Sequence, residues 1–474
     1  MPQPDYIRQM LHGHLLNTDY YQLLSEADKN SRITTQTDEL LNLLSHHRDE
    51  LPQPHQDYFD RSIKLLDSQD KRIPQIYGCP KVHKRDYIDN PLNRPILTCV
   101  ATLPQVYSTY IDYWMKKIVQ TLLPSYVKNA DTLIDELKKH FTRKLPPGAR
   151  LFSIDAISMY SNIDSVHGLQ VIHNFFEHFK DKLPKHFPTE FIERSLEIIM
   201  KQNIFQFGDT FWLQLMGCAM GTSAAVNYSY AYVGLLELQT LLVDYQEFLL
   251  FYKRFIDDGL GVWNVSLPNS ENKFKEFMAA LNNWGKLKWT CTGFVTSLEF
   301  LDLTISIQDK EIHFKTFQKL LNLYLYIPPI SAHSPDMIRG LIFGRLCCFH
   351  KHNTNIKDYY MMAKLLAQRL IARGWNWSFI RPIFSEAHNR ITKDHPSNPR
   401  TIIQPTMQPL IIHSTYHPRG LQRQDIRKIF NETLGEVIEN PTIIAQSRPY
   451  NLGNRLCRSK LLLLPGCNPS DFLP

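Results

Sequence analysis

The sequence lacks the features that mark several classes of protein. It contains no apolar run long enough to cross a bilayer and no signal peptide, so neither a membrane partner nor secretion is expected. Its eight cysteines show no CxxC spacing, and the adjacent Cys347 and Cys348 are poorly placed for a structural disulfide. The stretch "CCFHKH" (Cys347–His352) has no second ligand pair at zinc-finger spacing. These absences predict a soluble intracellular protein in a reducing compartment.

What is present is the composition of a globular protein with an uneven charge. With 474 residues, of which 43% are hydrophobic and 12% aromatic, the chain is too long for one core and predicts two to four subdomains. Residues 331–474 contain 19 Lys and Arg against 9 Asp and Glu, whereas the rest of the chain is slightly acidic. This basic third favours a polyanion partner such as nucleic acid, although solvated helix faces would give the same count.

The spacing of apolar residues predicts an α+β protein without internal repeats. Residues up to about 70 are expected to be helical, and the Pro-rich residues 72–100 should form short strands joined by a loop. Other expected elements are a strand turning into a helix (149–163), a hairpin tipped by Gly-Asp (204–214), a Gly-rich loop entering a long apolar helix (216–242), and a mainly helical segment from about 331.

Two acidic stretches carry the chemistry. In "YKRFIDDGLGVW" (Tyr252–Trp263), Asp257 and Asp258 precede Gly259, which is expected to take a positive φ in a hairpin turn. Alone, this is a common surface turn. In "LFSIDAISMY", however, Asp155 ends a second buried strand. Carboxylates from two strands at one sheet edge repel each other unless cations separate them, and a pair of Mg²⁺ ions about 3.5–4 Å apart would do so.

The order of these motifs resembles the palm of a reverse transcriptase, and more narrowly the polymerases of Penelope-like retroelements, which are related to telomerase. The resemblance covers roughly residues 70 to 461. It is carried by "YGCPKVHK" (Tyr77–Lys84), "NRPI" (Asn93–Ile96), "DAISMYSNI" (Asp155–Ile163), "MGCAMGTSAAVNYSYAYVGLLE" (Met216–Glu237), "YKRFIDDG" (Tyr252–Gly259), "LEFLDLTI" (Leu298–Ile305), "MIRGLIFGRLCCF" (Met337–Phe349) and "SRPYNLGNRLCRSKL" (Ser447–Leu461).

The resemblance implies a right-hand polymerase with fingers, an antiparallel palm sheet and a helical thumb. The expected parts are an N-terminal helical region (1–70), fingers (71–145), a palm with inserted finger helices (146–325), a thumb (326–440) and a C-terminal tail (441–474). Its expected activity is RNA-directed DNA synthesis from dNTPs on a DNA primer or exposed DNA 3′ end, in the nucleus.

The resemblance also implies the roles of residues around the metals. Asp155 and Asp257 would bind both Mg²⁺ ions, for which Mn²⁺ could substitute, with Asp258 beside them and the Ala156 carbonyl assisting. Lys81 and Arg94 match finger residues that hold the incoming triphosphate, although an ordinary basic loop would also contain them. Tyr160 occupies the steric-gate position, where its ring would exclude a ribose 2′-hydroxyl; otherwise it is a core residue.

Further positions follow from the same likeness. Met220, Gly221 and Thr222 match a loop that lies against the nascent base pair, although Val226 stands where the family commonly has proline. Lys288 is a possible proton donor, with Lys286 equally placed, and a surface role is the simpler explanation for both. Asp302, in the segment like a primer-grip hairpin, is expected to be structural. The thumb cations expected at the template–primer backbone are Arg339, Arg345, Lys364, Arg369 and Arg373.

Many members of this family carry a GIY-YIG endonuclease after the thumb. The sequence contains no such motif, so it is expected to be either part of a longer reading frame or an endonuclease-lacking form that extends exposed ends. Two other functions stay open at this point. The same core could synthesise RNA, which the position of Tyr160 disfavours, or the chain could bind nucleic acid without catalysis.

Overall fold

The computed structural model divides the chain into two compact units. The first comprises Met1–Leu301, Ile305–Ile312 and Ser459–Pro474, and the second comprises Asp302–Thr304 and His313–Arg458. The five-part division expected from sequence stays a prediction. The structure describes residues 2–67, 73–81, 93–218, 220–319, 322–331, 333–334, 336–393, 408–417, 419–438, 440–447, 449 and 467–473.

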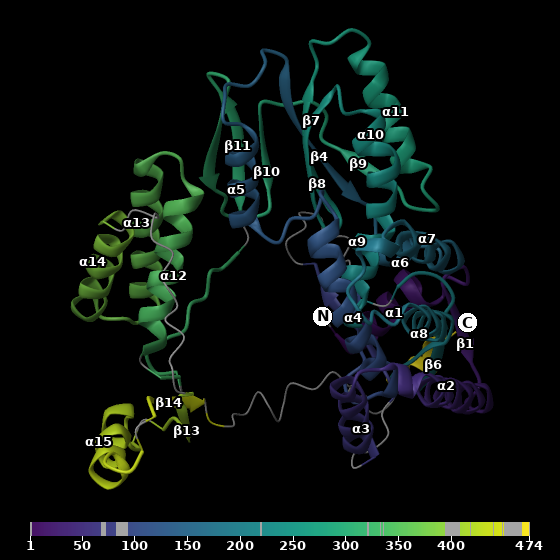
Figure 1. The fold of residues 1–474 in the computed structure, drawn as a ribbon, viewed down its shortest axis with the longest axis horizontal. Helices are drawn as coiled ribbons and strands as arrows, with labels where there is room; N and C mark the ends of the chain where they lie inside the picture. The colour runs from purple at the N-terminus through teal and green to yellow at the C-terminus, as the bar shows by residue number, and fades with distance from the viewer. Residues whose placement is uncertain are drawn as a thin grey trace. The chain divides into compact units, whose positions relative to one another are not determined.

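A four-stranded antiparallel sheet lies at the centre of the first unit, and we call it the palm sheet. Its order is β7 (Leu249–Phe255), β8 (Asp258–Asn264), β4 (Ala149–Ala156) and β9 (Trp289–Cys291), and Figure 1 shows these strands side by side. The Phe152 ring on β4 packs against Phe274 and Phe277 of α11 (Ser270–Asn282), with ring centroids 5.1 and 5.8 Å apart. This aromatic contact fixes a helix on the sheet.

A second sheet of the first unit, which we call the finger sheet, has five strands. They run in the order β1 (Tyr21–Leu24), β6 (Thr210–Gln214), β5 (Asn203–Phe207), β2 (Gln75–Pro80) and β3 (Asn93–Thr98). The pair β2–β5 is parallel and the other pairs are antiparallel. β1 corrects the expectation that residues up to about 70 are helical, because its strand is completed by a distant partner, β6.

Helices surround both sheets of the first unit. The most buried is α9, whose side chains are covered on nearly every face, as is typical of a helix that is apolar all round. The described helices are α1 (Gln3–Met10), η1 (Leu11–Leu15), α2 (Glu26–His47), η2 (Arg48–Glu50), α3 (Gln53–Asp67), α4 (Leu103–Leu122), α5 (Ala130–His140), α6 (Met159–Asn162), α7 (Ser165–His178), η3 (Lys180–Lys182), α8 (Thr189–Lys201), α9 (Ala225–Leu236), η4 (Glu237–Leu241), α10 (Leu242–Asp244), α11 and η5 (Pro469–Phe472).

The second unit is mainly helical, as expected. Its long helices α12 (Asp336–His352), α13 (Ile356–Ala372) and α14 (Trp377–Lys393) share a core around Ile342, Leu366 and Ile380. The unit also contains α15 (Arg423–Leu434) and a parallel pair, β13 (Leu410–Thr415) and β14 (Thr442–Ser447), which sequence reasoning missed. Where the chain passes from the first unit to the second, it forms β10 (Ser297–Phe300), β11 (Leu303–Gln308) and β12 (Glu311–Thr316). β11 pairs with both β10 and β12.

The α+β class predicted from the sequence is confirmed by these antiparallel sheets and their surrounding helices. The loop expected between β2 and β3, and most of "SRPYNLGNRLCRSKL" (Ser447–Leu461), lie outside the described residues. Within the described part of the chain, no helix combines the length and apolar character needed to cross a bilayer.

Candidate active site

A cavity of about 860 Å³ in the first unit lies where the palm sheet, the finger sheet and the N-terminal segment meet. A space of this size is within the range of small-molecule sites. Its lining residues are Gly13, His14, Asn17, Tyr20, Tyr21, Lys81, Asn93, Arg94, Pro95, Asp155, Ala156, Ile157, Ser158, Met159, Tyr160, Ser161, Asn162, Met220, Ile256, Asp257 and Asp258.

The three predicted catalytic carboxylates lie at one end of the palm sheet and line one cavity. Asp155 on β4 is directly opposite Asp258 on β8, and the amide of Ala156 donates to the carbonyl oxygen of Asp257 at 3.0 Å. Asp155, Asp257 and Asp258 all line the cavity. Burial, and then the negative charge of Asp155, raise the pKa of Asp257, whereas Arg94 opposes this rise. Side chains separated by about a hundred residues therefore share one electrostatic environment.

The turn that presents Asp257 differs from the expected one. Phe255 pairs with Asp258, so the turn consists of Ile256 and Asp257 alone. The positive φ belongs to Ile256, at 57°, and not to Gly259 as predicted. Gly259 lies inside β8, where a Cβ would come within 2.6 Å of the Ile154 side chain, so its small size serves strand packing. A β-branched residue in the left-handed region is strained, and the surroundings must hold it there.

The two predicted triphosphate ligands lie at one end of the finger sheet and line the same cavity. Arg94 on β3 is opposite Cys79 on β2, and Lys81 immediately follows β2. The Arg94 charge is close enough to affect the pKa values of both Asp257 and Tyr160. The cavity therefore has an anionic wall of carboxylates and a cationic contribution from the fingers.

Tyr160 lies on the short helix α6, between these two groups. Its side chain is partly buried and lines the cavity, and burial raises the pKa of its hydroxyl, so the ring is neutral at physiological pH. Its backbone carbonyl accepts a hydrogen bond from the Cys218 amide at 2.6 Å, which ties α6 to the Gly-rich loop. Tyr160 therefore offers a neutral ring beside the carboxylates.

Among the described residues of the Gly-rich loop, Met220 alone lines the cavity. The carbonyl of Met220 accepts a hydrogen bond from the Leu97 amide at 2.7 Å, and Gly221 has a φ of 125°. A Cβ on Gly221 would collide with the Leu97 carbonyl. Glycine is thus required for the loop to lie against β3. Thr222 is not among the described residues that line the cavity.

Neither candidate proton donor, Lys288 or Lys286, is among the described residues that line this cavity. The Lys288 amine donates to the Asn282 carbonyl at 2.7 Å, and Lys286 forms an ion pair with Asp164 at 3.2 Å. These contacts fit the surface roles that the sequence left open for both lysines. The proton-donor role of Lys288 stays a prediction.

The predicted thumb cations have different surroundings in the second unit. Arg369 donates to Gln318 at 2.7 Å, Arg373 donates to the Tyr326 carbonyl at 2.7 Å, and Arg339 pairs with Glu386. Arg345 lies 5.0 Å from the centre of the Phe349 ring, whereas Lys364 is exposed. Three of the five therefore have partners within the unit, which lowers what they would gain from a phosphate contact.

Sequence reasoning missed the wall that the N-terminal segment contributes. His14 shares a hydrogen bond of 3.1 Å with the Asn93 carbonyl, and Tyr20 donates to Asn162 at 2.8 Å. Burial, with a further contribution from the Lys81 charge, lowers the pKa of His14. No local motif marks this wall, because these residues are held at the cavity by contacts with distant segments, those of Asn93 and Asn162.

The donor set fits a divalent cation that keeps part of its coordination shell for substrate. Within the described ranges, no three His, Cys, Asp or Glu side chains are gathered closely enough to hold an ion by themselves. Mg²⁺ is commonly bound by one or two carboxylates, with water and substrate phosphates as the remaining ligands, and rarely by an all-protein cage. Asp155, Asp257 and the neighbouring main-chain carbonyls match that pattern in chemical type.

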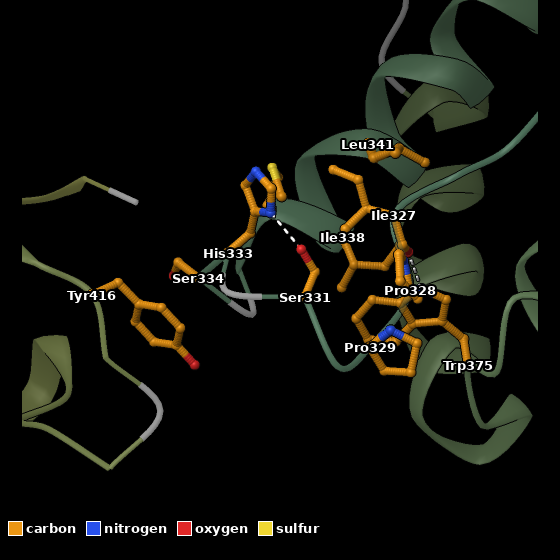
Figure 2. A pocket seen from close by; sticks show the side chains of 11 residues that line it. Ile327, Pro328, Pro329, Ser331, His333, Ser334, Ile338, Leu341, Trp375 and Tyr416 are labelled. Carbon is orange, nitrogen blue, oxygen red and sulfur yellow. Dashed lines mark hydrogen bonds between the residues drawn. The ribbon is translucent and has the colours of Figure 1, made fainter. Parts of the chain in front are cut away.

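A second cavity, of about 170 Å³, lies in the second unit and is shown in Figure 2. Its walls are mostly apolar, with Pro328, Pro329 and Trp375 near one end, and Ser331 and His333 share a hydrogen bond of 2.6 Å. None of its described lining residues is Asp, Glu, Lys or Arg.

No family model and no curated protein matches this chain. Solved structures similar to part of it include telomerase from Candida albicans with a TWJ fragment of telomeric RNA, at 11% identity and a TM-score of 0.45, covering 70% of this chain and 62% of that one. Apo telomerase from Candida tropicalis has 10% identity and a TM-score of 0.42, covering 67% and 59%. The Sicinivirus 3Dpol RNA-dependent RNA polymerase also has 10% identity and a TM-score of 0.42, covering 69% and 70%.

The chain thus spans less than two thirds of the length of either telomerase chain. With TM-scores below 0.5, these likenesses decide neither the reaction nor the substrate. Both must be inferred from the cavity and its side chains.

Proposed function

We propose that this chain is an RNA-directed DNA polymerase of the Penelope-like type, a right-hand enzyme that adds dNTPs to a primer 3′-hydroxyl. The observation that carries the proposal is the meeting of Asp155, Asp257 and Asp258 in a cavity that also contains Lys81 and Arg94. Anionic and cationic groups around one space suit a substrate that brings both metal ions and a triphosphate. The order of the motifs along the sequence supports the narrower family assignment.

The carboxylates would hold two Mg²⁺ ions, with Mn²⁺ as a substitute. Asp155 and Asp257 would each contact both ions, with Asp258 and the Ala156 carbonyl beside them. Bound divalent cations supply charge neutralisation for the primer 3′-hydroxyl and for the departing pyrophosphate. Burial is the main cause of the raised pKa of Asp257, and the Asp155 charge adds to it; a cation bound between the two carboxylates would offset their repulsion.

The fingers would orient the triphosphate and Tyr160 would select the sugar. Arg94 offers a planar fork of donors and Lys81 a compact charge, two forms of phosphate contact that position the reacting phosphorus. The Tyr160 ring would occupy the space that a ribose 2′-hydroxyl needs. Replacement by a small residue, Tyr160→Ala, should therefore raise the rNTP-to-dNTP ratio of kcat/KM by at least ~10-fold, given the size of typical pocket discrimination.

The template–primer duplex would contact the basic second unit. The exposed Lys364 is the best supported of the five predicted cations, because Arg339, Arg369 and Arg373 already have internal partners. Nuclear location belongs to the same proposal. Microscopy of the tagged full-length product in its host would test it, and exclusion from the nucleus would contradict it.

The proposal is tested by primer extension. The purified chain should extend a DNA primer on an RNA template with Mg²⁺ and dNTPs, and Asp257→Asn should reduce extension by at least ~10²-fold, since charge stabilisation at the reacting groups is lost. Asp209→Asn is the matched control, because Asp209 occupies the equivalent turn position in the β5–β6 hairpin, outside the cavity. It should retain wild-type activity.

Three outcomes would contradict the proposal. Equal extension by Asp257→Asn would remove the assigned catalytic carboxylate. A preference for rNTPs would indicate an RNA polymerase instead. Nucleic-acid binding without extension in either Mg²⁺ or Mn²⁺, by this chain and by the full reading frame that encodes it, would indicate a binding protein that lacks catalysis.

A further inference from the structure

A buried ion pair lies beneath the hairpin that carries Asp257. Arg254 on β7 and Glu237 at the start of η4 both have side chains with 0% exposure. Their contact is bidentate, with Arg254 Nε to Glu237 Oε1 at 2.5 Å and Nη2 to Oε2 at 3.0 Å. Since the cost of desolvating two charges often cancels their attraction, such a pair is weak evidence of a stabilising role alone. Its other contacts indicate what it does.

The guanidinium of Arg254 also holds the strained turn residue. Nη1 donates to the Ile256 carbonyl at 2.8 Å, and the Ile256 amide donates to the Tyr230 hydroxyl at 2.9 Å. Both main-chain polar groups of Ile256 are therefore bound by buried side chains. Ile256 is the residue with the left-handed φ of 57°, and the next residue is Asp257. These two hydrogen bonds therefore hold Ile256 in its strained conformation.

Glu237 anchors the arginine to the rest of the first unit. Its two oxygens also accept hydrogen bonds from Ser125 at 2.5 Å and Tyr252 at 3.0 Å. It opens a π-helical turn, a form often found at functional sites, on the helix that follows the Gly-rich loop. Arg254 Nη2 additionally donates to the Tyr230 carbonyl on that helix at 3.0 Å. The network therefore links the hairpin to α9.

We propose that Arg254 is a positioning residue, which together with Glu237 and Tyr230 fixes the Ile256 turn and so sets the place of the Asp257 carboxylate. Arg254 and Glu237 are absent from the described lining of the cavity, so they act through Ile256 and not by touching substrate. The inference rests on the proposed function, because the reaction that the Asp257 carboxylate would serve is the one proposed above. Its geometric part, that these contacts hold the turn, is independent of any reaction.

Two variants separate positioning from general stability. Arg254→Lys keeps a positive charge beside Glu237 but lacks the planar fork that reaches Glu237 and the Ile256 carbonyl together. Tyr230→Phe keeps the ring beside Arg254 and removes only the hydroxyl that accepts from Ile256. The control is Ser270→Ala, which removes a buried hydrogen bond with Trp263 and leaves the Ile256 turn untouched.

The full chain carrying each variant is compared with wild type in two ways. In primer extension, Arg254→Lys and Tyr230→Phe should lower kcat by ~10- to 10²-fold, the effect of a small misplacement, while KM for dNTP stays within about 3-fold. In hydrogen exchange, the amides of residues 256–258 should exchange faster in both variants. Ser270→Ala should leave kcat and these amides as in wild type.

Wild-type kcat in both variants, or unchanged exchange at residues 256–258, would overturn the inference. The inference would also be overturned if Ser270→Ala lost as much kcat as the two variants at an equal loss of stability. Arg254 and Glu237 would then stabilise the fold in general and not the turn in particular. A wild-type chain without activity would contradict the proposed function, and the exchange measurement would still decide whether Arg254 and Tyr230 hold the turn.

Discussion

Two hairpins of the first unit end in two-residue turns of the same form. Gly208 and Asp209 join β5 to β6, and Ile256 and Asp257 join β7 to β8. The first residue of each turn has a positive φ, of 60° at Gly208 and 57° at Ile256. The second residue of each is an aspartate. The two turns therefore differ mainly in which residue takes the left-handed conformation and in what surrounds it.

The difference shows where the local sequence stops determining the structure. Glycine adopts a positive φ at no steric cost, so the β5–β6 turn follows from its own two residues. Isoleucine adopts it only under constraint, and here Arg254 and Tyr230 supply that constraint. Strain held by buried partners is characteristic of functional sites, and the strained turn is the one that lines the cavity.

The largest effect expected from this comparison concerns Glu237. Glu237→Gln leaves the Arg254 charge buried without its counter-ion, so the free energy of unfolding should fall by about 3–5 kcal/mol. The β5–β6 turn has an exposed tie instead, from the amide and the hydroxyl of Ser470 to Asp209, and Ser470→Ala, which removes only the hydroxyl bond, should cost within about 0.5 kcal/mol. Urea unfolding of both variants measures the contrast, and equal costs would remove it.

A double variant tests the same claim, that Arg254 holds the Ile256 turn. Arg254→Met with Glu237→Leu leaves no buried charge, so the free energy of unfolding should be higher than that of Glu237→Gln, although the Ser125 and Tyr252 hydroxyls lose their acceptor. The Ile256 carbonyl would still lack its donor, and the amides of residues 256–258 should still exchange faster than in wild type. Slow, wild-type exchange in the double variant would show that the turn does not need the arginine.

An intermediate effect is expected when the turn residues are altered. Gly208→Ala places a Cβ in the left-handed region of the β5–β6 turn and should cost about 1–2 kcal/mol of unfolding free energy. Ile256→Gly removes a similar strain but also the partly buried side chain, so its net change should be smaller. Urea unfolding midpoints test both, and a neutral Gly208→Ala would show that the two turns are not alike.

A smaller effect concerns Asp164, a carboxylate that caps a helix. Asp164 caps α7 by accepting from the amides of Val166 and His167 at 3.0 Å each, and these bonds together with Lys286 lower its pKa. Asp164→Ala should cost about 1 kcal/mol at pH 7. Because the folded pKa is depressed, this contribution is present above the unfolded pKa of about 4 and is lost as the pH falls through the folded value.

Comparing unfolding of Asp164→Ala and wild type between pH 7 and pH 2 checks the sign. The difference between the two proteins should shrink as the pH falls. A difference that grows at low pH would contradict the assignment of Asp164 as an ionised cap.

Much of the fold was predictable because many of its elements depend on the pattern of residues that lie close together in the sequence. Apolar spacing located the long apolar helix α9 after the Gly-rich loop, and the Gly-Asp pair located the β5–β6 turn. β1, β13 and β14 were missed, since a short strand is defined by its partner and β1 pairs with residues almost two hundred positions away. Such pairing leaves little trace in the local sequence.

The candidate site was predictable to the extent that motifs carry it. Asp155, Asp257, Arg94 and Tyr160 were all named from sequence and all line one cavity. The N-terminal wall, including His14, and the bracing of Ile256 could not be predicted, because both arise from contacts between distant segments. The position of positive φ was also mistaken, since glycine is the usual residue for it and isoleucine is not.

The most direct test of the central claim is anomalous X-ray diffraction from crystals of the chain grown with Mn²⁺ and a dNTP. Two Mn²⁺ peaks, about 3.5–4 Å apart, are expected between the carboxylates of Asp155 and Asp257. Saturating Mn²⁺ with no peak at these carboxylates, or with ions bound only elsewhere on the protein, would contradict it.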